Sequence, residues 1–280
     1  MKNLLTGVCN NITQHIDKIL LWKNSFESVV DNGEVVLIAY NPSPNDIEVL
    51  KQNNITYHGI KENSSETVNN MRLLPMSEFL KDNFNNYSKV LYTDVFDVAF
   101  TKDPFQKLDT DNYDIFVAGE GIVHNSEPWN MDVMAKCFPQ YVQAIKQYEI
   151  FCSGVIAGKP LELSRWLKAM NDICLTSKKG HDIEDQAAMN ILIMQNVYYN
   201  KESSNTNTFI ERFKIKYFNL KDNWAIHLAT GGPTQFFEPW GFKNSILKRY
   251  GIVPNWKDYD IVHQFNRIPE IHKEIIKRYE

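Results

Sequence analysis

Short apolar runs alternate with amphipathic segments along the first part of the chain. The runs at residues 4–9, 34–40 and 55–58 predict buried strands. Residues 12–30 repeat apolar side chains at helical spacing, and a turn at residues 41–46 caps a second helix that ends near residue 52. This β-α-β-α-β order predicts a parallel sheet of the Rossmann type. The chain lacks Gly-x-Gly-x-x-Gly, so the dinucleotide-binding fingerprint is absent.

The later part of the chain continues this alternation less regularly. We expect strands at residues 113–119, 150–158, 214–218, 224–229 and 260–267, and helices at residues 71–84, 132–148, 161–176 and 269–279, with another helix opening at residues 182–190. Residues 61–70 and 120–130 are expected to be loops, and residues 230–233 a turn. We find no repeat, low-complexity tract or clear linker. We therefore expect residues 1–280 to form a single α/β domain with a mostly parallel central sheet flanked by helices.

Two aspartates interrupt the apolar stretch at residues 89–100. The stretch begins as a buried strand, and Asp94 and Asp97 then stand three positions apart among apolar residues. On a straight strand they would face opposite sides, but they converge if the strand ends near Asp94 and the chain turns. Two convergent buried carboxylates need compensation, which a divalent cation such as Mg²⁺ or Mn²⁺ supplies, and the usual partner of such an ion is a diphosphate. The alternative is that one aspartate caps the turn and the other is solvated.

Composition narrows the class of protein. With 43% hydrophobic and 23% charged residues, the chain of 280 residues is typical of a soluble globular protein. The net charge of −4 and the lack of a basic stripe argue against a nucleic-acid partner. No apolar run approaches the roughly 18 residues that span a bilayer, and the first apolar segment is too short for a signal peptide. The four cysteines have no paired spacing, so we expect reduced thiols and a cytoplasmic location, with association at the membrane surface through a partner left open.

Small residues and one cation mark further candidates for a site. Gly7 breaks the first strand, where a glycine lets the backbone approach a ligand closely and a simple turn is the alternative. Ser153 and Gly154 form a small-residue patch in the middle of a strand, which suits a sugar or a phosphate. Arg72 is a lone cation at the head of an apolar helix. We weigh a surface position for Arg72 against a contact with a ligand phosphate or with Asp94.

Polar and aromatic residues later in the chain complete the set. Asp185 and Gln186 stand at the head of a helix, where the helix dipole alone favours an acidic residue. The last expected strand carries His263. Trp240 lies in an expected loop and is either a packing anchor or a surface on which a sugar ring stacks.

The order and spacing of these features resemble the glycosyltransferases of the GT-A fold. The resemblance is strongest to bacterial and viral members with an Asp-x-x-Asp motif and to the glycosyltransferase domain of lysyl-hydroxylase-type collagen enzymes, which share the spacing seen at residues 93–98. Similar bacterial sequences also have counterparts of residues 5–8, 152–154, 185–186 and 261–267. The resemblance runs from Thr6 to about Pro269, so it covers nearly the whole chain.

The resemblance implies a metal-dependent transfer of a sugar from a nucleoside diphosphate sugar, which we expect to be UDP-linked, to a hydroxyl of a glycan, lipid-linked or protein acceptor. Asp94 and Asp97 would hold Mn²⁺ or Mg²⁺, with His263 as the third ligand. His227 is the alternative third ligand, because its segment is similar to one in the collagen enzymes. The other residues that would bind the donor or take part in the chemistry are Thr6, Gly7, Arg72, Thr93, Val95, Ser153, Gly154, Asp185, Gln186 and Arg267.

The mechanism and two departures from the family pattern stay open at this point. Asp185 would act as a base if the transfer inverts the anomeric centre, and would only position the sugar if it retains it. Arg72 or Arg267 would help to stabilise the leaving diphosphate. Asn266 stands where an aspartate is expected, and Phe96 where an arginine is more usual, and both changes bear on the identity of the donor.

Two rival functions remain. An aspartyl phosphatase or phosphotransferase would need Asp-x-Asp spacing at the strand end, which the chain lacks. A glycosyltransferase-fold protein that binds a sugar nucleotide or a carbohydrate without turnover is the second rival. The sequence does not indicate an oligomeric state.

Overall fold

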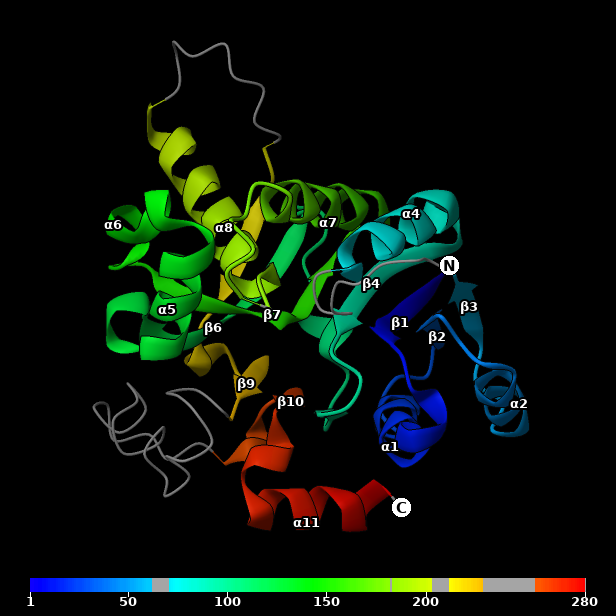
Figure 1. The fold of residues 1–280 in the computed structure, drawn as a ribbon. Helices are drawn as coiled ribbons and strands as arrows, with labels where there is room; N and C mark the ends of the chain where they lie inside the picture. Colours follow the sequence, from blue (N-terminus) through cyan, green and yellow to red (C-terminus); the bar gives the residue numbers. More distant parts are fainter. Residues whose placement is uncertain (62–70, 182, 203–211, 229–254, 280) are drawn as a thin grey trace.

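A sheet of seven strands runs through the centre of the molecule (Figure 1). The computed structural model describes residues 1–61, 71–181, 183–202, 212–228 and 255–279. The strand order is β3-β2-β1-β4-β7-β6-β8, with bounds β1 Lys2–Cys9, β2 Gly33–Tyr40, β3 Tyr57–Ile60, β4 Tyr87–Thr93, β6 Ile115–Val123, β7 Glu149–Gly158 and β8 Ile215–Phe218. Neighbouring strands are parallel except at β7, which is antiparallel to both β4 and β6. The prediction of an α/β fold with a mostly parallel central sheet is confirmed.

Helices cover both faces of this sheet. On one face lie α4 (Leu73–Asn83), α7 (Pro160–Cys174) and α8 (Asp185–Glu202), and on the other lies α1 (Ile16–Glu27) (Figure 1). Alternate residues of each strand point to the two faces. Leu4, Val36 and Val90 pack with the first group of helices, and Leu5, Leu37 and Leu91 pack with Trp22 and Phe26 of α1. Burial on both faces explains why these strands appear in the sequence as continuous apolar runs.

A smaller sheet brings the end of the chain to the aspartate stretch. Its strands lie in the order β5-β10-β9, with bounds β5 Val98–Phe100, β9 Ala225–His227 and β10 Ile261–His263. The central strand β10 is antiparallel to β5 and parallel to β9, and it places His263 opposite both Val98 and His227. Helix α11 (Pro269–Tyr279) follows and lies beyond this sheet (Figure 1).

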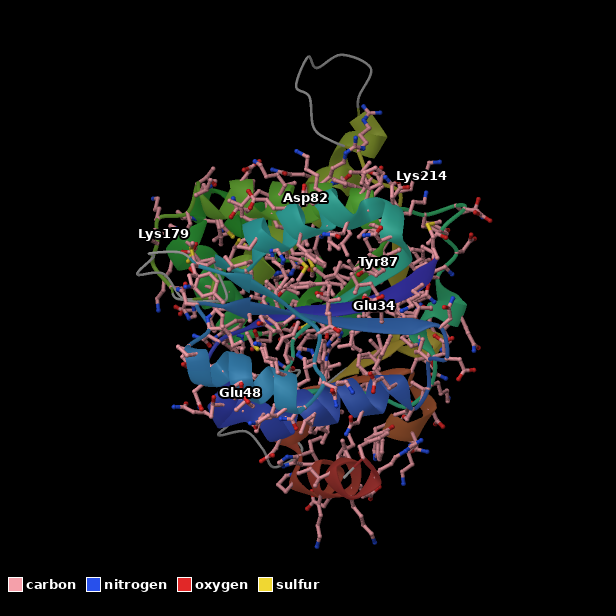
Figure 2. All side chains as sticks on the ribbon, turned by 90° about the vertical axis from the view of Figure 1, so that its right-hand side faces the viewer. Glu34, Glu48, Asp82, Tyr87, Lys179 and Lys214 are labelled. Atoms are coloured by element: carbon pink, nitrogen blue, oxygen red, sulfur yellow. The ribbon has the colours of Figure 1, made fainter. Side chains whose placement is uncertain are left out.

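The remaining helices connect and extend the main sheet. α2 (Pro44–Gln52) follows β2 and begins with a capping box, in which the Ser43 side chain and the Asp46 backbone amide are paired. α5 (Pro128–Cys137) and α6 (Val142–Ile145) pack with α8 in a separate apolar cluster. Charged side chains such as Glu48, Asp82, Lys179 and Lys214 lie at the periphery (Figure 2).

The direction of the connections reverses between β1 and β4. β2 and β3 follow on one side of β1, and β4 lies on its other side. In open α/β sheets, such a reversal leaves a crevice at the carboxyl ends of the strands, and ligands bind there. Gly7 lets the two strands approach at this point, because a Cβ there would lie 2.5 Å from the Thr93 carbonyl oxygen.

Several expected elements have different bounds in the structure. Residues 120–130 are not a loop, because β6 continues to Val123 through two glycines and α5 begins at Pro128. The helix expected at residues 132–148, with an interruption at Phe138 and Pro139, begins earlier, at Pro128, and is divided at that interruption into α5 and α6, since Pro139 lacks the amide that a continuous helix requires. The strand expected at residues 260–267 ends at His263, because Gln264 adopts a left-handed conformation with φ 58° and a 3-10 turn follows.

Three further expectations concern the cysteines, a membrane-spanning helix and residues outside the described ranges. None of the four cysteines forms a disulfide. Within the described ranges, no helix combines the length and the apolar character that crossing a membrane requires. Trp240 and the turn expected at residues 230–233 lie outside the described residues.

Candidate functional site

A cleft of about 1080 Å³ opens at the carboxyl ends of β1, β2 and β4. Its walls come from residues that follow each strand, including Asn10, Asn41 and Asp94. The Asp46 carboxylate ties two of these segments together, since it accepts hydrogen bonds from the backbone amide and hydroxyl of Thr13, both at 2.7 Å, and from Ser43. The cleft therefore lies where the reversal of the strand order predicts a ligand site.

Asp94 and Asp97 stand at the inner end of this cleft. The end of β4 is fixed by the Asp94 amide, which donates to the Gly154 carbonyl oxygen at 2.9 Å, and the chain then turns into β5. The turn brings both carboxylates to His263, whose Nε2 lies 3.2 Å from Asp94 Oδ2 and 3.6 Å from Asp97 Oδ1. A ligand atom from each residue lies within 4.8 Å of the other two, so this group, called here the metal side, could hold a metal ion.

The donor atoms of the metal side fit a divalent cation. Two carboxylate oxygens and one imidazole nitrogen suit Mn²⁺ and, through the oxygens, Mg²⁺. Gly154 provides the space in which they meet, because a Cβ at this position would lie 2.5 Å from His263 Cε1 and 2.6 Å from Asp94 Oδ2. The turn that the sequence predicts after β4 therefore depends on a glycine on the adjacent strand β7, which leaves room for the side chains that meet there.

The pKa values of the Asp94 and Asp97 carboxyl groups are shifted in opposite directions. Burial opposes the charge of Asp94, but the Arg72 guanidinium and His263 outweigh it and hold the pKa of Asp94 below its usual range. Burial raises the pKa of Asp97, and the negative charge of Asp94 adds to this effect against the opposing effect of His263. A cation bound beside Asp97, in addition to His263, would thus favour ionisation of the Asp97 carboxyl group.

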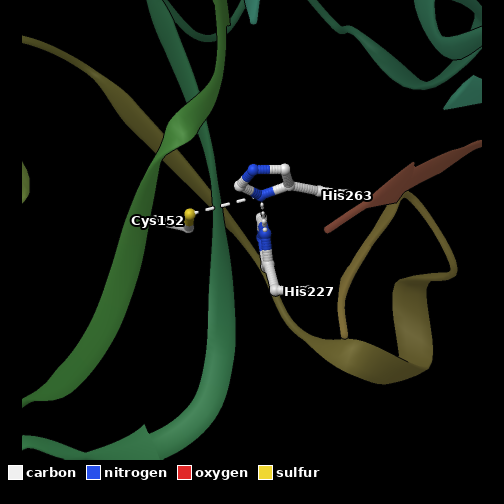
Figure 3. A group of neighbouring side chains, drawn as sticks. All are labelled: Cys152, His227 and His263. Carbon is white, nitrogen blue, oxygen red and sulfur yellow. Dashed lines mark hydrogen bonds between the residues drawn. The ribbon is translucent and has the colours of Figure 1, made fainter. Parts of the chain in front are cut away.

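His227 lies next to the ring of His263 (Figure 3). Its Nδ1 is 2.9 Å from Nδ1 of His263, while Nε2 of His263 is the atom that faces Asp94 and Asp97. Cys152 approaches the same Nδ1 at 3.4 Å. Of the two candidate third ligands, the structure brings His263 to the aspartates and places His227 behind it.

Arg72 joins the metal side to a second group of polar residues. It is buried, so the interpretation of Arg72 as a surface residue is wrong, and its guanidinium forms close ion pairs with both Asp94 and Asp185. Its Nε also donates to Asp185 Oδ2 at 3.1 Å. The weighed contact between Arg72 and Asp94 is present.

Asp185 and Gln186 begin α8 and face β7. Ser153 Oγ donates to Asp185 Oδ2 at 3.3 Å, and the Gln186 amide donates to Asp185 Oδ1 at 2.8 Å. Gln186 Oε1 accepts from the Ser153 amide at 3.4 Å. The structure thus brings together three of the residues that the sequence selected separately.

Glu120 and Asn130 complete this second group, and sequence reasoning missed both. The Gln186 side-chain amide donates to Asn130 Oδ1 at 2.9 Å and to Glu120 Oε1 at 3.4 Å. Burial raises the pKa of Glu120 to about 8, and the nearby Glu127 adds to the shift. The available signal was an acidic residue that continues the apolar run of residues 115–118. Residues Glu120, Asn130, Ser153, Asp185 and Gln186 are called here the sugar side.

Five other residues were predicted to bind the donor, and their positions relative to the cleft differ. Thr6 is fully buried, and its hydroxyl points to the Met76 sulfur at 3.8 Å, while Thr93 Oγ1 accepts from the Trp22 indole at 2.8 Å. The cleft begins at Val8, beyond Thr6 and Gly7, and includes Val95. Arg267 lies in the 3-10 turn after β10, where its charge acts on Asp97.

Similarity to known proteins is found in the structure and not in the sequence. No family model matches the sequence, and no curated protein matches it. The structure aligns over 94% of the chain with the glycosyltransferase GlyE from Streptococcus pneumoniae TIGR4, at a TM-score of 0.54 and 15% identity, and spans 54% of that protein. It also aligns with the galactosyltransferase LgtC, solved with donor and acceptor sugar analogs, over 99% of this chain and 96% of LgtC, at a TM-score of 0.51 and 14% identity.

These alignments establish the fold. The chain has the GT-A fold of these glycosyltransferases, as the sequence resemblance predicted. It spans about half the length of GlyE and nearly all of LgtC.

Proposed function

We propose that this protein is a glycosyltransferase that moves a hexosyl group from a nucleoside diphosphate sugar, UDP-linked, to a hydroxyl of a glycan, lipid or protein acceptor. The observation that carries the proposal is the convergence of Asp94 and Asp97, which line the cleft, with His263. Two partly buried carboxylates that converge cost free energy, which a bound cation would offset together with Arg72 and His263. Support also comes from LgtC, which shares the fold and was solved with donor and acceptor sugar analogs.

Departure of the diphosphate places negative charge on its oxygens. Asp94, Asp97 and His263 would hold Mn²⁺ or Mg²⁺, which supplies Lewis-acid stabilisation of that charge. Arg72 lies in the same cleft and adds a permanent positive charge beside Asp94. Because Arg72 is buried and ion-paired on both sides, its position is set before a donor binds.

The sugar side would orient the donor sugar and the acceptor hydroxyl. Both oxygens of Asp185 are already engaged, one by Arg72 and Ser153 and the other by the Gln186 amide. We therefore assign Asp185 a positioning role for Arg72 and Gln186. Gln186 is held by Asn130 and Glu120 but is only partly buried, whereas Asp185 is buried, so Gln186 is the residue of this group that would contact the sugar.

The proposal is tested by measuring UDP release from a panel of UDP-hexoses with Mn²⁺, Mg²⁺ or EDTA. We expect turnover that EDTA abolishes and that Asp97→Ala reduces by at least about 100-fold, the scale for losing one charge-stabilising element. Asp172→Ala is the matched control, because Asp172 pairs with Lys168 on the exposed surface of α7, where both side chains are about half exposed.

Two results would contradict the proposal. Activity of Asp97→Ala equal to that of the wild type would remove the metal role of this residue. Metal-dependent binding of UDP with no release from any UDP-hexose, in the presence of simple sugar acceptors, would instead support the binding protein without turnover.

A further inference from the structure

Three buried side chains meet behind the metal side. Cys152 comes from β7, His227 from β9 and His263 from β10 (Figure 3). They converge on Nδ1 of His263, which lies 2.9 Å from His227 Nδ1 and 3.4 Å from Cys152 Sγ. The opposite ring nitrogen, Nε2, faces Asp94 and Asp97. His263 therefore connects the metal side to a second set of contacts.

The proton on His263 Nδ1 decides what Nε2 can do. A neutral imidazole carries one proton, so a lone pair on Nε2 requires that the proton be on Nδ1. In a buried position, that N–H needs an acceptor. His227 Nδ1 is the nearer neighbour, at 2.9 Å, while Cys152 Sγ lies 3.4 Å away and thiol sulfur is a weak acceptor.

The sheet holds this pair in place. His227 and His263 are directly opposite each other in the parallel pair β9–β10, and the Leu228 amide donates to the His263 carbonyl oxygen at 3.0 Å. The two rings are nearly perpendicular, at 88°, so they meet through their nitrogen atoms and do not stack face to face. The register of the smaller sheet thus sets the orientation of the His263 ring.

We propose that His227 is a positioning residue, which accepts the Nδ1 proton of His263 and so directs the Nε2 lone pair of His263 at the cation held with Asp94 and Asp97. The inference rests on the proposed metal role of the site. In metal sites, a partner that fixes a ligating histidine contributes about 10- to 100-fold in metal affinity or activity. His227 would then act on the cation without touching it.

The same three side chains admit a competing interpretation, a buried soft-metal site made by Cys152, His227 and His263. The close approach of the two Nδ1 atoms is that of a hydrogen bond, which already accounts for the arrangement.

The experiment measures binding of Mn²⁺ alone, by the electron paramagnetic resonance signal of the free ion, to the full chain without any sugar nucleotide. In His227→Leu the acceptor is absent, and in His227→Asn the side-chain oxygen takes the place of Nδ1. We expect His227→Leu to lose about 10- to 100-fold in Mn²⁺ affinity and His227→Asn to retain most of it. His124→Leu is the matched control, since His124 is also buried and its Nδ1 lies 3.1 Å from the Tyr148 carbonyl oxygen.

A second measurement needs no variant. In wild-type protein with ¹⁵N-labelled histidine and saturating Mg²⁺, NMR should find the shared proton on His263 Nδ1 and none on His227 Nδ1. The reverse assignment would overturn the inference, as would equal Mn²⁺ affinity in wild type and His227→Leu, or an equal loss in both His227 variants. Stoichiometric zinc in the purified protein that disappears in Cys152→Ser would also overturn it. If wild-type protein binds neither Mn²⁺ nor Mg²⁺, the metal role itself fails, whereas metal binding with the reverse proton assignment overturns the role of His227 alone.

Discussion

The metal side and the sugar side of the site balance their charges differently. Asp185 on the sugar side keeps 1% of its side chain exposed, and its oxygens accept from Arg72, Ser153 and the Gln186 amide. Asp94 and Asp97 on the metal side keep 30% and 17% exposed; both face His263, Asp94 also pairs with Arg72, and the charge of Arg267 acts on Asp97. The Asp185 carboxylate therefore has its partners within the protein, while the carboxylates of the metal side stay partly open to a ligand.

This difference indicates which group is ready for a ligand. Buried carboxylates with a full set of hydrogen bonds fix the geometry of their neighbours. The raised pKa of Asp97 indicates a carboxylate whose negative charge is not fully compensated. A bound cation would compensate it. Arg72 is the contact that both sides share, so changes there test the comparison most severely.

The largest expected effect is that of Arg72→Met on stability. Removing the guanidinium leaves Asp94 and Asp185 without their shared cation, and breaking a buried pair costs about 3–5 kcal/mol. Urea denaturation should measure a loss of this size. Arg165→Met is the control, because Arg165 pairs with Glu162 at the surface with 49% of its side chain exposed, and should change stability by less than about 1 kcal/mol.

Double variants distinguish the two partners of Arg72. Asp185→Asn in the Arg72→Met background should recover more stability than Asp94→Asn does, since Asp185 is the more deeply buried. Equal recovery would mean that the two sides do not differ as described.

A smaller effect is expected when a cation binds the metal side. At a concentration of 100 times its dissociation constant, Mn²⁺ should stabilise the wild-type protein by about 2.7 kcal/mol, because it binds the folded state. Asp97→Asn should lose this response and, without metal, should be more stable than the wild type near neutral pH, because the disfavoured charge is gone. Thermal unfolding with Mn²⁺ and with EDTA measures both effects. A wild-type response that survives in Asp97→Asn would locate the cation elsewhere.

The sequence was sufficient to predict that Asp94 and Asp97 converge after β4, because that signal is local. Asp94 and Asp97 stand out against an apolar strand, and the parallel part of the sheet follows the order of the chain. The choice of His263 came from a resemblance, and its position depends on the pairing of β10 with β5, which no local pattern contains.

The sugar side could not be predicted in the same way, because its contacts join distant parts of the chain. Arg72 and Asp185 are 113 residues apart, and at the head of an apolar helix a cation has the same pattern whether it is buried or exposed. Glu120 lies between two glycines, which are typical of a loop, although β6 continues through it. Only the pairing of β6 with β7 brings Glu120 to Gln186.

Per unit of pH, the smallest expected effect is a dependence of stability on pH that originates in Glu120. Its pKa rises from an ordinary 4.5 to about 8 in the folded protein because of burial and the charge of Glu127. Between these values the folded state binds more protons than the unfolded state, so this residue makes stability fall as pH rises, by up to about 1.4 kcal/mol per pH unit. Glu120→Gln removes the titration, and its stability relative to the wild type should therefore increase from about pH 5 to about pH 8. Urea denaturation across this range measures the difference, and Glu48→Gln on the exposed surface of α2 is the control. A constant difference between Glu120→Gln and the wild type would show that Glu120 is already ionised in the folded protein. The sugar side would then, like the metal side, hold a negative charge that the protein does not fully compensate.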